Sequence, residues 1–544
     1  MSAGIGETIP TGSSISLRRF WAIVGGIALV CLLLKVPVMY RQHAAGDEDF
    51  YAVPGLTLLQ EGRLRVPFMP CRDHGSMFYR ADDRLLTLPP LYFFWQAACY
   101  AVFGATVGSA RLASGIAGVG SILLLGALAL RITRSERTAL TAVVFYAASR
   151  VVYFPWLMSR PDTLTGFFGF ASMLFVLRLL EAPSRRTAAL AGLFAGLGLY
   201  THPFALVYSA QGGLLCLWSG RGWREKLELA VIFSCLTLAV ASLWLFLILP
   251  EPLLWKEQFL DLMGLQVGPG LPRRFFWPGQ SLPVQAAVYL EHVGLWQCLL
   301  MTGSLLIAAV LAIRNRAWRL IVFLAVSAMY FHVVSLGTHP TKGYWCYTGG
   351  WLWICFAMVV DRAAGLMQTV RARQIAFAAL AGVSAALMVP GCGVRTLVQH
   401  LRHWNDIEYD APRFTRMLLS KLPPEATLAV DQAYVFEFYA AGRRNMITAL
   451  EFPLVFSLQQ FPYDLIVAGE YALDKKVPEI NRGKAIAQYG WLDDPFACAA
   501  IIYEAPPDRR AHGVFPADGG RPNTSIDAGS TDTTPGGGEA RENP

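Results

Sequence analysis

Long apolar segments alternate with short polar loops through the first 392 residues of the chain. Segments of roughly 17–25 apolar residues can cross a bilayer as helices, and about eleven can be placed. The pattern therefore predicts a polytopic α-helical membrane protein. The expected spans lie near residues 20–40, 109–130, 138–155, 163–180, 188–200, 203–218, 228–249, 292–313, 319–336, 344–360 and 375–392.

One further apolar segment, 88–104, decides the topology. It opens with two prolines and is rich in aromatic residues, which favours a juxtamembrane or re-entrant segment over a span. If it does not span, every compact basic loop faces the cytoplasm, as the positive-inside rule expects, together with residues 1–19. The loop 41–108 then lies outside. The basic loops carry Arg131/Arg134/Arg137, Arg178/Arg185/Arg186, Arg221/Arg224/Lys226, Arg314/Arg316/Arg319 and Arg362/Arg371/Arg373.

Composition supports the membrane assignment. The chain is 54% hydrophobic and 15% charged, whereas soluble domains carry about 25% charged residues. The net charge of +8 does not indicate nucleic-acid binding, because the basic residues sit in short loops between apolar segments. The 10 cysteines include no CxxC pair and are expected to act as small hydrophobic residues. A disulfide involving Cys71, Cys392 or Cys498 remains an alternative.

Beyond residue 392 charged residues return and the apolar segments become short. We expect a transmembrane domain at 20–392 followed by a small exterior, periplasmic α/β domain at 393–505. The tail 506–544 is rich in Gly, Pro, Asp, Thr and Ser, and is expected to be disordered. Strands are predicted at 427–430, 464–468 and 498–503, and a helix at 433–441.

Three carboxylates, Asp47, Glu48 and Asp49, follow the first predicted span directly. Carboxylates at the edge of a bilayer are costly unless water, a partner or a function accommodates them. Tyr51 would share a helix face with Asp47, and the stretch 53–59 is moderately amphipathic. We therefore expect a membrane-surface helix with its carboxylates at one end, although a solvated loop is the simpler alternative.

Other exterior loops of this topology carry candidate binding residues. Asp162 follows a proline at the start of a span, so it either caps the helix or serves the site. The neighbouring Arg160 can contact phosphate. Two arginines in the 250–290 loop depart from the positive-inside pattern, which favours contact with a lipid phosphate. No metal-ligand spacing, nucleotide loop or hydrolase motif is present. The candidates are Arg160, Asp162, His202, Arg273, Arg274, Lys342 and Tyr344.

The order of these motifs resembles the GT-C membrane glycosyltransferases. The most similar branch uses polyprenyl-phosphate sugars and is related to the protein O-mannosyltransferases and the lipid A aminoarabinose transferase. Leu88 departs from the pattern, because the family usually carries His or Lys before the two prolines. The matching motifs are Asp47-Glu48-Asp49-Phe50-Tyr51, Pro89-Pro90-Leu91-Tyr92-Phe93-Phe94-Trp95, Phe103-Gly104 followed by Arg111, Asp162, Lys342 with Tyr344, and the C-terminal α/β domain.

The resemblance implies an inverting glycosyltransferase at the outer face of the bacterial inner membrane. The donor would be a sugar on an undecaprenyl-type phosphate, and the acceptor a lipid, protein or glycan of the envelope. Asp47 would act as base, Glu48 would orient it or support the site from behind, and Asp162 would support the acceptor or the base. No cofactor would be required, although a divalent cation is left open. The substrate contacts would be Tyr51, Arg160, His202, Arg273, Arg274, Lys342 and Tyr344.

Two alternatives remain. A secondary transporter has a similar number of spans, but transporters place their sites near the bilayer midplane, often between repeated halves. Here we find no internal repeat, and the polar residues gather at one membrane edge. A ligase or oligosaccharyltransferase that moves a whole glycan would more typically bind a divalent metal through Asp47, Glu48 and Asp162.

Overall fold

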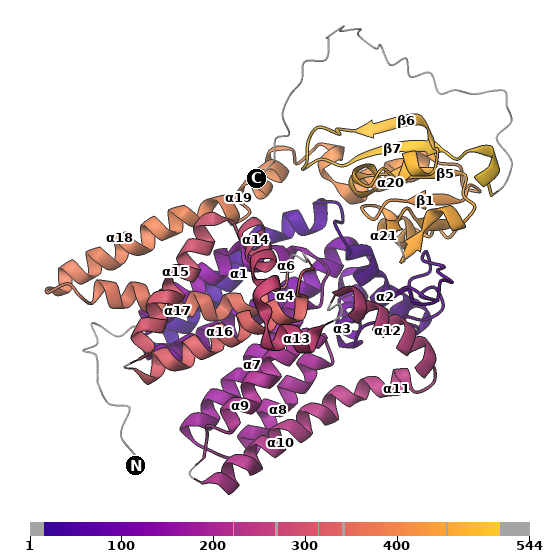
Figure 1. Ribbon diagram of the computed structural model, residues 1–544. Coiled ribbons are helices and arrows are strands. Elements are labelled where there is room, and N and C mark those ends of the chain that lie inside the picture. Colours follow the sequence, from indigo (N-terminus) through magenta and orange to yellow (C-terminus); the bar gives the residue numbers. More distant parts are fainter. Residues whose placement is uncertain are drawn as a thin grey trace.

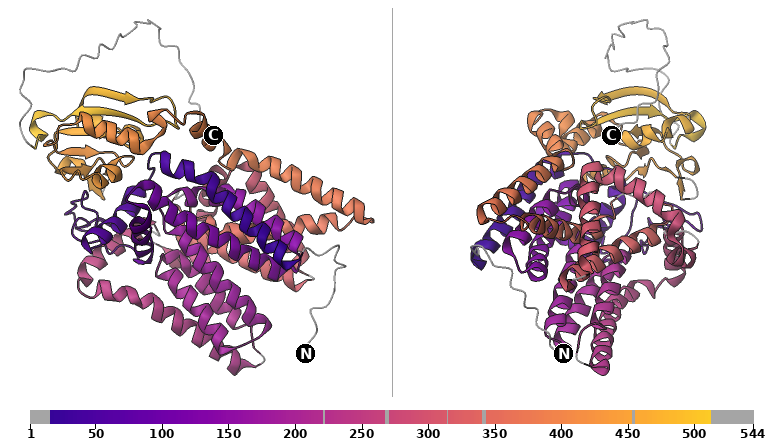
Figure 2. Two further views of the ribbon diagram at one scale, coloured as in Figure 1. Left: turned by 180° about the vertical axis from the view of Figure 1, so that it is seen from behind. Right: turned by 60° about the vertical axis from the view of Figure 1, so that its left-hand side comes forward.

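The computed structural model describes residues 16–511, apart from positions 221, 267–269, 314, 340–342 and 453–454. It shows a bundle of long helices with a smaller domain of strands and helices at one end (Figure 1). Both views in Figure 2 place this domain at the same end of the bundle. Lys342, the tail beyond residue 511 and most of the predicted cytoplasmic N-terminus lie outside the described residues.

Seven described helices are long and apolar enough to cross a membrane, which confirms a polytopic helical membrane protein. The predicted count of about eleven spans is not confirmed. At three predicted positions the helices are shorter or less apolar: α8 (Arg185–Leu199), α9 (Leu206–Cys216) and α17 (Cys346–Ala364). The seven are α1 (Leu17–Arg41), α4 (Val107–Thr133), α7 (Asp162–Glu181), α10 (Trp223–Ala241) continued by α11 (Leu245–Ile248), α15 (Leu295–Ala312), α16 (Arg316–Leu336) and α18 (Val370–Met388) with the turn up to Gly391.

An eighth span is formed if α5 (Glu136–Ala148) and α6 (Arg150–Leu157) are taken together, with a bend of 53° between them. Ser149 causes the bend, because its extended backbone (φ −71°, ψ 141°) interrupts the helical hydrogen bonds. Its hydroxyl accepts from the Val151 N–H and donates to Gln297 Oε1 of α15 at 3.1 Å. Hydrogen bonds to α6 and to α15 thus hold the bend in place.

Basic residues predicted to face the cytoplasm lie far from Asp162. Helix α7 begins at Asp162 and ends at Glu181, a separation of about 30 Å at the helical rise. At the far end, Glu181 binds both Arg131 and Arg134. Arg131 and Arg134 therefore lie at the opposite end of α7 from Asp162.

The loop between α1 and α4 contains two short helices, α2 (Glu48–Glu61) and α3 (Leu91–Phe103). Helix α3 has 13 residues and is too short to span, which agrees with the juxtamembrane assignment. The prediction of a membrane-surface helix for α2 is wrong, because its residues 48–57 are buried. Gln96 of α3 packs so closely on Gly55 that a Cβ there would lie 2.3 Å from Gln96 Oε1.

The 250–290 loop contains helices that the sequence pattern did not predict: α12 (Pro252–Gln266), α13 (Leu271–Phe276) and α14 (Ser281–Val293). Gln258 of α12 is fully buried, and its amide donates to the carbonyl oxygens of Tyr79 and Arg84 at 2.7 and 2.9 Å. In Figure 1, α11 and α12 run back toward α2 and α3. The 250–290 loop is therefore fixed against the loop between α1 and α4.

The C-terminal domain is built on a five-stranded sheet of order β2-β1-β5-β7-β6. Strands β2, β1 and β5 are parallel, and β7 is antiparallel to both β5 and β6. The strands predicted at 427–430, 464–468 and 498–503 correspond to β1, β5 and β7. The bounds are β1 (Leu428–Val430), β2 (Met446–Thr448), β5 (Leu465–Ala468), β6 (Lys484–Gly490) and β7 (Ala499–Glu504), with helices α20 (Ala411–Lys421), α21 (Val435–Ala440), α22 (Glu470–Asp474) and α23 (Val477–Ile480) and the hairpin β3 (Glu451–Phe452) and β4 (Phe456–Ser457).

Helix α21 fixes this domain to the bundle. Phe436 stacks on Tyr100 of α3, with ring centroids 5.9 Å apart. Glu437 Oε1 accepts from the Val107 N–H at the start of α4, at 2.9 Å. The side chains of α2, α3 and α21 share one hydrophobic core. All 10 cysteines are free, so no disulfide contributes.

Candidate active site

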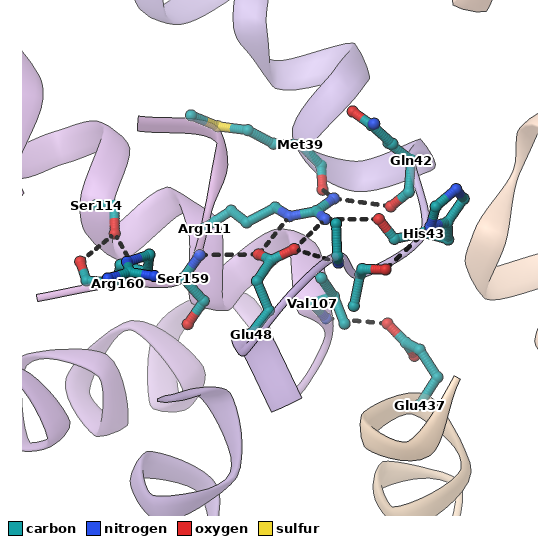
Figure 3. Close-up of polar contacts among 12 residues, drawn as sticks. Met39, Gln42, His43, Glu48, Val107, Arg111, Ser114, Ser159, Arg160 and Glu437 are labelled. Atoms are coloured by element: carbon teal, nitrogen blue, oxygen red, sulfur yellow. Dashed lines mark hydrogen bonds and ion pairs between the residues drawn. The ribbon is translucent and has the colours of Figure 1, made fainter. Parts of the chain in front are cut away.

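A buried ion pair between Glu48 and Arg111 holds the loop that follows α1 (Figure 3). The two side chains are 1% and 3% exposed. Arg111 donates to both carboxylate oxygens of Glu48, at 2.8 and 2.6 Å, and its other N–H groups bind three carbonyl oxygens of the loop. Because an arginine has five N–H donors, this set is complete. The carbonyl oxygens belong to Met39, Gln42 and His43.

Glu48 has no free carboxylate oxygen. Besides Arg111, it accepts from the backbone N–H of Ala45 at 2.9 Å and of Ser159 at 2.8 Å. The contact to Ser159 links the loop after α1 to the loop before α7. Glu48 thus positions its neighbours, in agreement with the orienting role that the resemblance implies.

Arg160 bridges the other two candidate carboxylates. Its Nη1 donates to both oxygens of Asp47, at 2.8 and 2.9 Å, and its Nε donates to Asp162 Oδ2 at 2.9 Å. The backbone of Arg160 is fixed by Ser114, whose hydroxyl donates to the Arg160 carbonyl at 3.0 Å (Figure 3). Two sequence-distant carboxylates are therefore held on one guanidinium group.

Exposure separates the roles of the three carboxylates. The side chain of Asp47 is 45% exposed, whereas those of Asp162 and Glu48 are each 1% exposed. Of these three, Asp47 alone can accept a proton from a molecule that enters from water. Asp162 instead fixes Arg160 from the buried side.

Aromatic side chains enclose the guanidinium of Arg160. The rings of Tyr51 and Tyr344 lie with their centroids 5.2 and 5.5 Å from it. The hydroxyl of Tyr347 donates to Asp162 Oδ1 at 2.9 Å. The Tyr344 side chain is fully buried, with its hydroxyl beside the same guanidinium group.

His202 lies on the buried side of this cluster and is 2% exposed. Burial lowers its pKa to about 4, although the charge of Asp162 opposes the shift. Its Nδ1 accepts from the Phe204 N–H at 3.2 Å, so this nitrogen carries no proton. His202 is therefore neutral at pH 7 and acts as a hydrogen-bonding group.

Asp49 is separate from the cluster, although it follows Glu48 directly. It is fully buried; Oδ1 accepts from the Phe50 N–H at 2.8 Å, while Oδ2 has no partner among the described residues. Burial raises the pKa of Asp49 well above its ordinary value, and the nearby Asp47 and Asp431 carboxylates add to the shift. Asp49 thus belongs to the buried contact between α2 and the C-terminal domain.

The structure brings together most of the predicted site residues. Arg274 is half-buried against Gly337, which precedes the turn of Tyr344, whereas Arg273 is exposed and makes no contact with the cluster. Lys342 lies outside the described residues. The residues that meet around Arg160 are Asp47, Tyr51, Asp162, His202 and Tyr344, with Glu48 adjacent.

Two members of the site were missed from the sequence. Arg111 was recognised as part of a motif but not as the partner of Glu48, and Tyr347 was not among the candidates. A buried arginine in an otherwise apolar span is a usable signal, because such a charge requires a partner. Among the described residues, no group of three or more His, Cys, Asp or Glu side chains is arranged to hold a metal ion.

Comparison with known proteins places this geometry in context. Residues 87–248 match the family model of dolichyl-phosphate-mannose-protein mannosyltransferase. A Pseudomonas aeruginosa (strain LESB58) protein named undecaprenyl phosphate-alpha-4-amino-4-deoxy-L-arabinose arabinosyl transferase is 28% identical over 273 residues. This match covers 46% of the chain and 46% of that relative, about half the length of each. A Pseudomonas paraeruginosa protein of the same name is 30% identical over 28% of the chain and 29% of the relative.

Similarity to solved structures extends over nearly the whole chain. The crystal structure of ArnT from Cupriavidus metallidurans bound to undecaprenyl phosphate aligns with a TM-score of 0.59 and 14% identity, covering 90% of this chain and 98% of that one. The apo state of the same protein aligns with a TM-score of 0.54 at the same coverage. The fold that the resemblance implied is confirmed: the chain shares the fold of this Cupriavidus protein.

Proposed function

We propose that the chain is an inverting glycosyltransferase that moves a sugar from a polyprenyl phosphate to an envelope lipid, protein or glycan. The observation that carries this proposal is the solvent-accessible carboxylate of Asp47, held by the buried Arg160 at a membrane end of the bundle. The names of the Pseudomonas relatives and the undecaprenyl phosphate bound to the Cupriavidus protein support a polyprenyl-phosphate donor.

In the reaction, Asp47 accepts the proton of an acceptor hydroxyl group. The acceptor oxygen forms a bond to the anomeric carbon from the side opposite the phosphate. The bond between that carbon and the phosphate oxygen breaks, and the polyprenyl phosphate leaves with the electron pair. Attack opposite the leaving group inverts the anomeric configuration.

The departing phosphate gains negative charge, which a nearby cation stabilises. Arg160 uses Nε and Nη1 for the two carboxylates, so in the described part of the chain its Nη2 remains for a phosphate oxygen. The Tyr344 hydroxyl supplies a second donor beside it. Because the carboxylates that a ligase would use for a metal are already paired, Asp47 and Asp162 with Arg160 and Glu48 with Arg111, we propose that the reaction requires no divalent cation.

We also propose that the site faces the exterior side of the inner membrane. The site lies at the end of α7 opposite the basic residues Arg131 and Arg134. The positive-inside rule assigns those residues to the cytoplasm. The C-terminal domain, which packs on α2 and α3, then also lies outside.

A reconstitution assay tests the function. The purified protein is incubated with an undecaprenyl-phosphate-linked sugar and an envelope lipid extract, and products are identified by mass spectrometry and by the anomeric coupling in NMR. We expect a covalent glycosylated product of inverted configuration, formed equally with a chelator present. Flux of the donor across proteoliposomes without any covalent product would instead identify a transporter, and loss of activity with a chelator would favour the ligase alternative.

A further inference from the structure

Lys35 lies buried in the membrane-spanning helix α1, with no anionic partner. Its side chain is 7% exposed, and it precedes the end of the helix at Arg41 by roughly 9 Å along the axis. Among the described residues, no hydrogen bond or salt bridge involves its ammonium group. A charge within a membrane-spanning helix is costly when it is not compensated. Lys35 therefore requires a partner that the described residues do not supply.

Two aromatic rings of α6 hold the ammonium group in place. The Lys35 Nζ lies 4.2 Å from the ring centroid of Tyr153 and 5.6 Å from that of Trp156. Tyr153 is itself packed on Gly393, where a Cβ would lie 1.9 Å from the ring and where φ is +80°. These cation–π contacts orient the ammonium group but leave its charge unneutralised.

A second unpaired cation lies beside the same turn. Arg150 lies one helical turn before Tyr153 on α6. A Cβ added to Gly391 would lie 3.3 Å from the Cβ of Arg150. In the part of the chain that is described, its guanidinium makes no salt bridge. Lys35 and Arg150 thus flank the turn 389–393 that joins α18 to α19 (Val394–Arg402).

The position of α19 indicates the depth of this turn in the membrane. This helix packs along α1 and exposes Val394, Val398 and Leu401 on one side, at 48%, 52% and 52%. A short amphipathic helix with an exposed apolar stripe lies in the membrane interface, where lipid phosphates also lie. Below the turn, Leu33 and Leu34 of α1 are exposed and offer an apolar surface for acyl chains.

We propose that Lys35 and Arg150 bind the phosphate group of a membrane lipid in the leaflet at the Arg41 end of α1. The phosphate pairs with both cations, and the acyl chains of the lipid lie along Leu33 and Leu34 of α1. In the described contacts, neither residue binds Asp47, Arg160 or Asp162. The site is therefore distinct from the cluster around Arg160, and the proposal does not depend on the proposed function.

The test measures thermal unfolding of the full-length protein in a non-ionic detergent with added dioctanoyl phosphatidic acid. A ligand that binds the native state raises the unfolding temperature in a saturable manner. We expect such a rise with phosphatidic acid and none with dioctanoyl glycerol, which lacks the phosphate. Inorganic phosphate is the third probe, because it carries the charge without the acyl chains.

Substitutions assign the effect to Lys35. Lys35→Met removes the charge while filling the same space, and we expect it to weaken the response to phosphatidic acid at least about tenfold in concentration. Arg18→Gln at the other end of α1 should leave the response unchanged. Lys35→Arg should retain it, which covers the case in which the Met variant does not fold.

Two results would overturn the proposal. The first is a Lys35→Met protein, folded in detergent, that keeps the full response to phosphatidic acid. The second is an equal response to inorganic phosphate and to phosphatidic acid at the same concentration, which would identify a site for a free anion rather than a lipid.

Discussion

Arg160 binds both carboxylate oxygens of Asp47 through a single nitrogen, at 2.8 and 2.9 Å. This contact fixes the direction of the exposed carboxylate without burying it, since Asp47 remains 45% exposed. Asp162 holds the same guanidinium from the buried side at 2.9 Å. Asp47 is thus oriented in advance toward the place where an acceptor enters, which lowers the reorganisation needed for reaction.

The hydrogen bond from Tyr347 to Asp162 is expected to matter for the rate. Tyr347→Phe removes a donor to a buried carboxylate, a bond that contributes roughly 1.5–3 kcal/mol. Because Asp162 then holds Arg160 less firmly, we predict a roughly ten- to hundredfold fall in the transfer rate. Tyr208→Phe is the matched control, since the Tyr208 hydroxyl donates to a backbone carbonyl at the longer distance of 3.4 Å. Equal rates for wild type and Tyr347→Phe would show that this bond is not used.

The ion pair of Glu48 and Arg111 is expected to govern stability. Arg111→Met leaves a buried carboxylate without its partner, which costs about 3–5 kcal/mol in the free energy of unfolding. The double variant Glu48→Leu/Arg111→Met should lose less than the sum of the two single variants, because no unpaired charge remains. Denaturant unfolding measures both.

An exposed pair in the same chain serves as the comparison. Arg80 and Asp83 are 41% and 48% exposed and lie 3.0 Å apart. Arg80→Met is therefore expected to change the free energy of unfolding by less than about 1 kcal/mol. If Arg80→Met lowered the free energy of unfolding as much as Arg111→Met, burial would not be the cause of the large effect at Arg111.

His202 is expected to make the free energy of unfolding depend on pH. Its pKa is lowered by burial from 6.5 to about 4, so the native state favours the neutral ring. The contribution of the neutral ring to the free energy of unfolding is fully present above pH 6.5. It is lost as the pH falls to about 4, by roughly 3 kcal/mol in total. His202→Asn retains an acceptor for the Phe204 N–H but does not titrate. We predict a flatter dependence of its unfolding temperature on pH across this window; an unchanged slope would argue against a buried neutral His202.

Asp49 is expected to change the stability with pH in the opposite direction from His202. Its raised pKa means that the native state binds the proton more tightly than the unfolded chain does. Stability from this group is therefore greatest below pH about 4, and falls as the pH rises through the native pKa. Asp49→Asn keeps the acceptor for the Phe50 N–H and cannot ionise. We predict that this variant is more stable than wild type at neutral pH and equal to it in acid, as measured by thermal unfolding.

Much of the bundle could be predicted because its apolar segments are long. Every predicted span has a helix near it, and the short α3 was distinguished from a span by its prolines and aromatic residues. The bend at Ser149 could not be predicted, since a serine within an apolar segment is ordinary. Its extended backbone depends on Gln297, which is 148 residues away in the chain.

Burial of α2 shows why a local pattern was insufficient. The stretch after Asp47 has the composition of an interfacial helix, but the C-terminal domain covers it, and Tyr439 reaches Glu61 across 378 positions of sequence. Loop charges were enough to predict that Asp47, Asp162, His202 and Tyr344 would share one membrane edge. They could not reveal which carboxylate remains accessible, because that depends on the partners Arg111 and Arg160.

The most direct test of the central claim is the transfer rate of Asp47→Asn with a polyprenyl-phosphate-linked sugar. Asn retains an oxygen for Arg160 but cannot accept a proton, so the rate should fall roughly 10²–10⁴-fold while the unfolding temperature stays near that of wild type. Asp83→Asn, which changes an exposed carboxylate of the same loop between α1 and α4, should keep full activity. A folded Asp47→Asn protein that transfers sugar at the wild-type rate would contradict the assignment of Asp47 as the base.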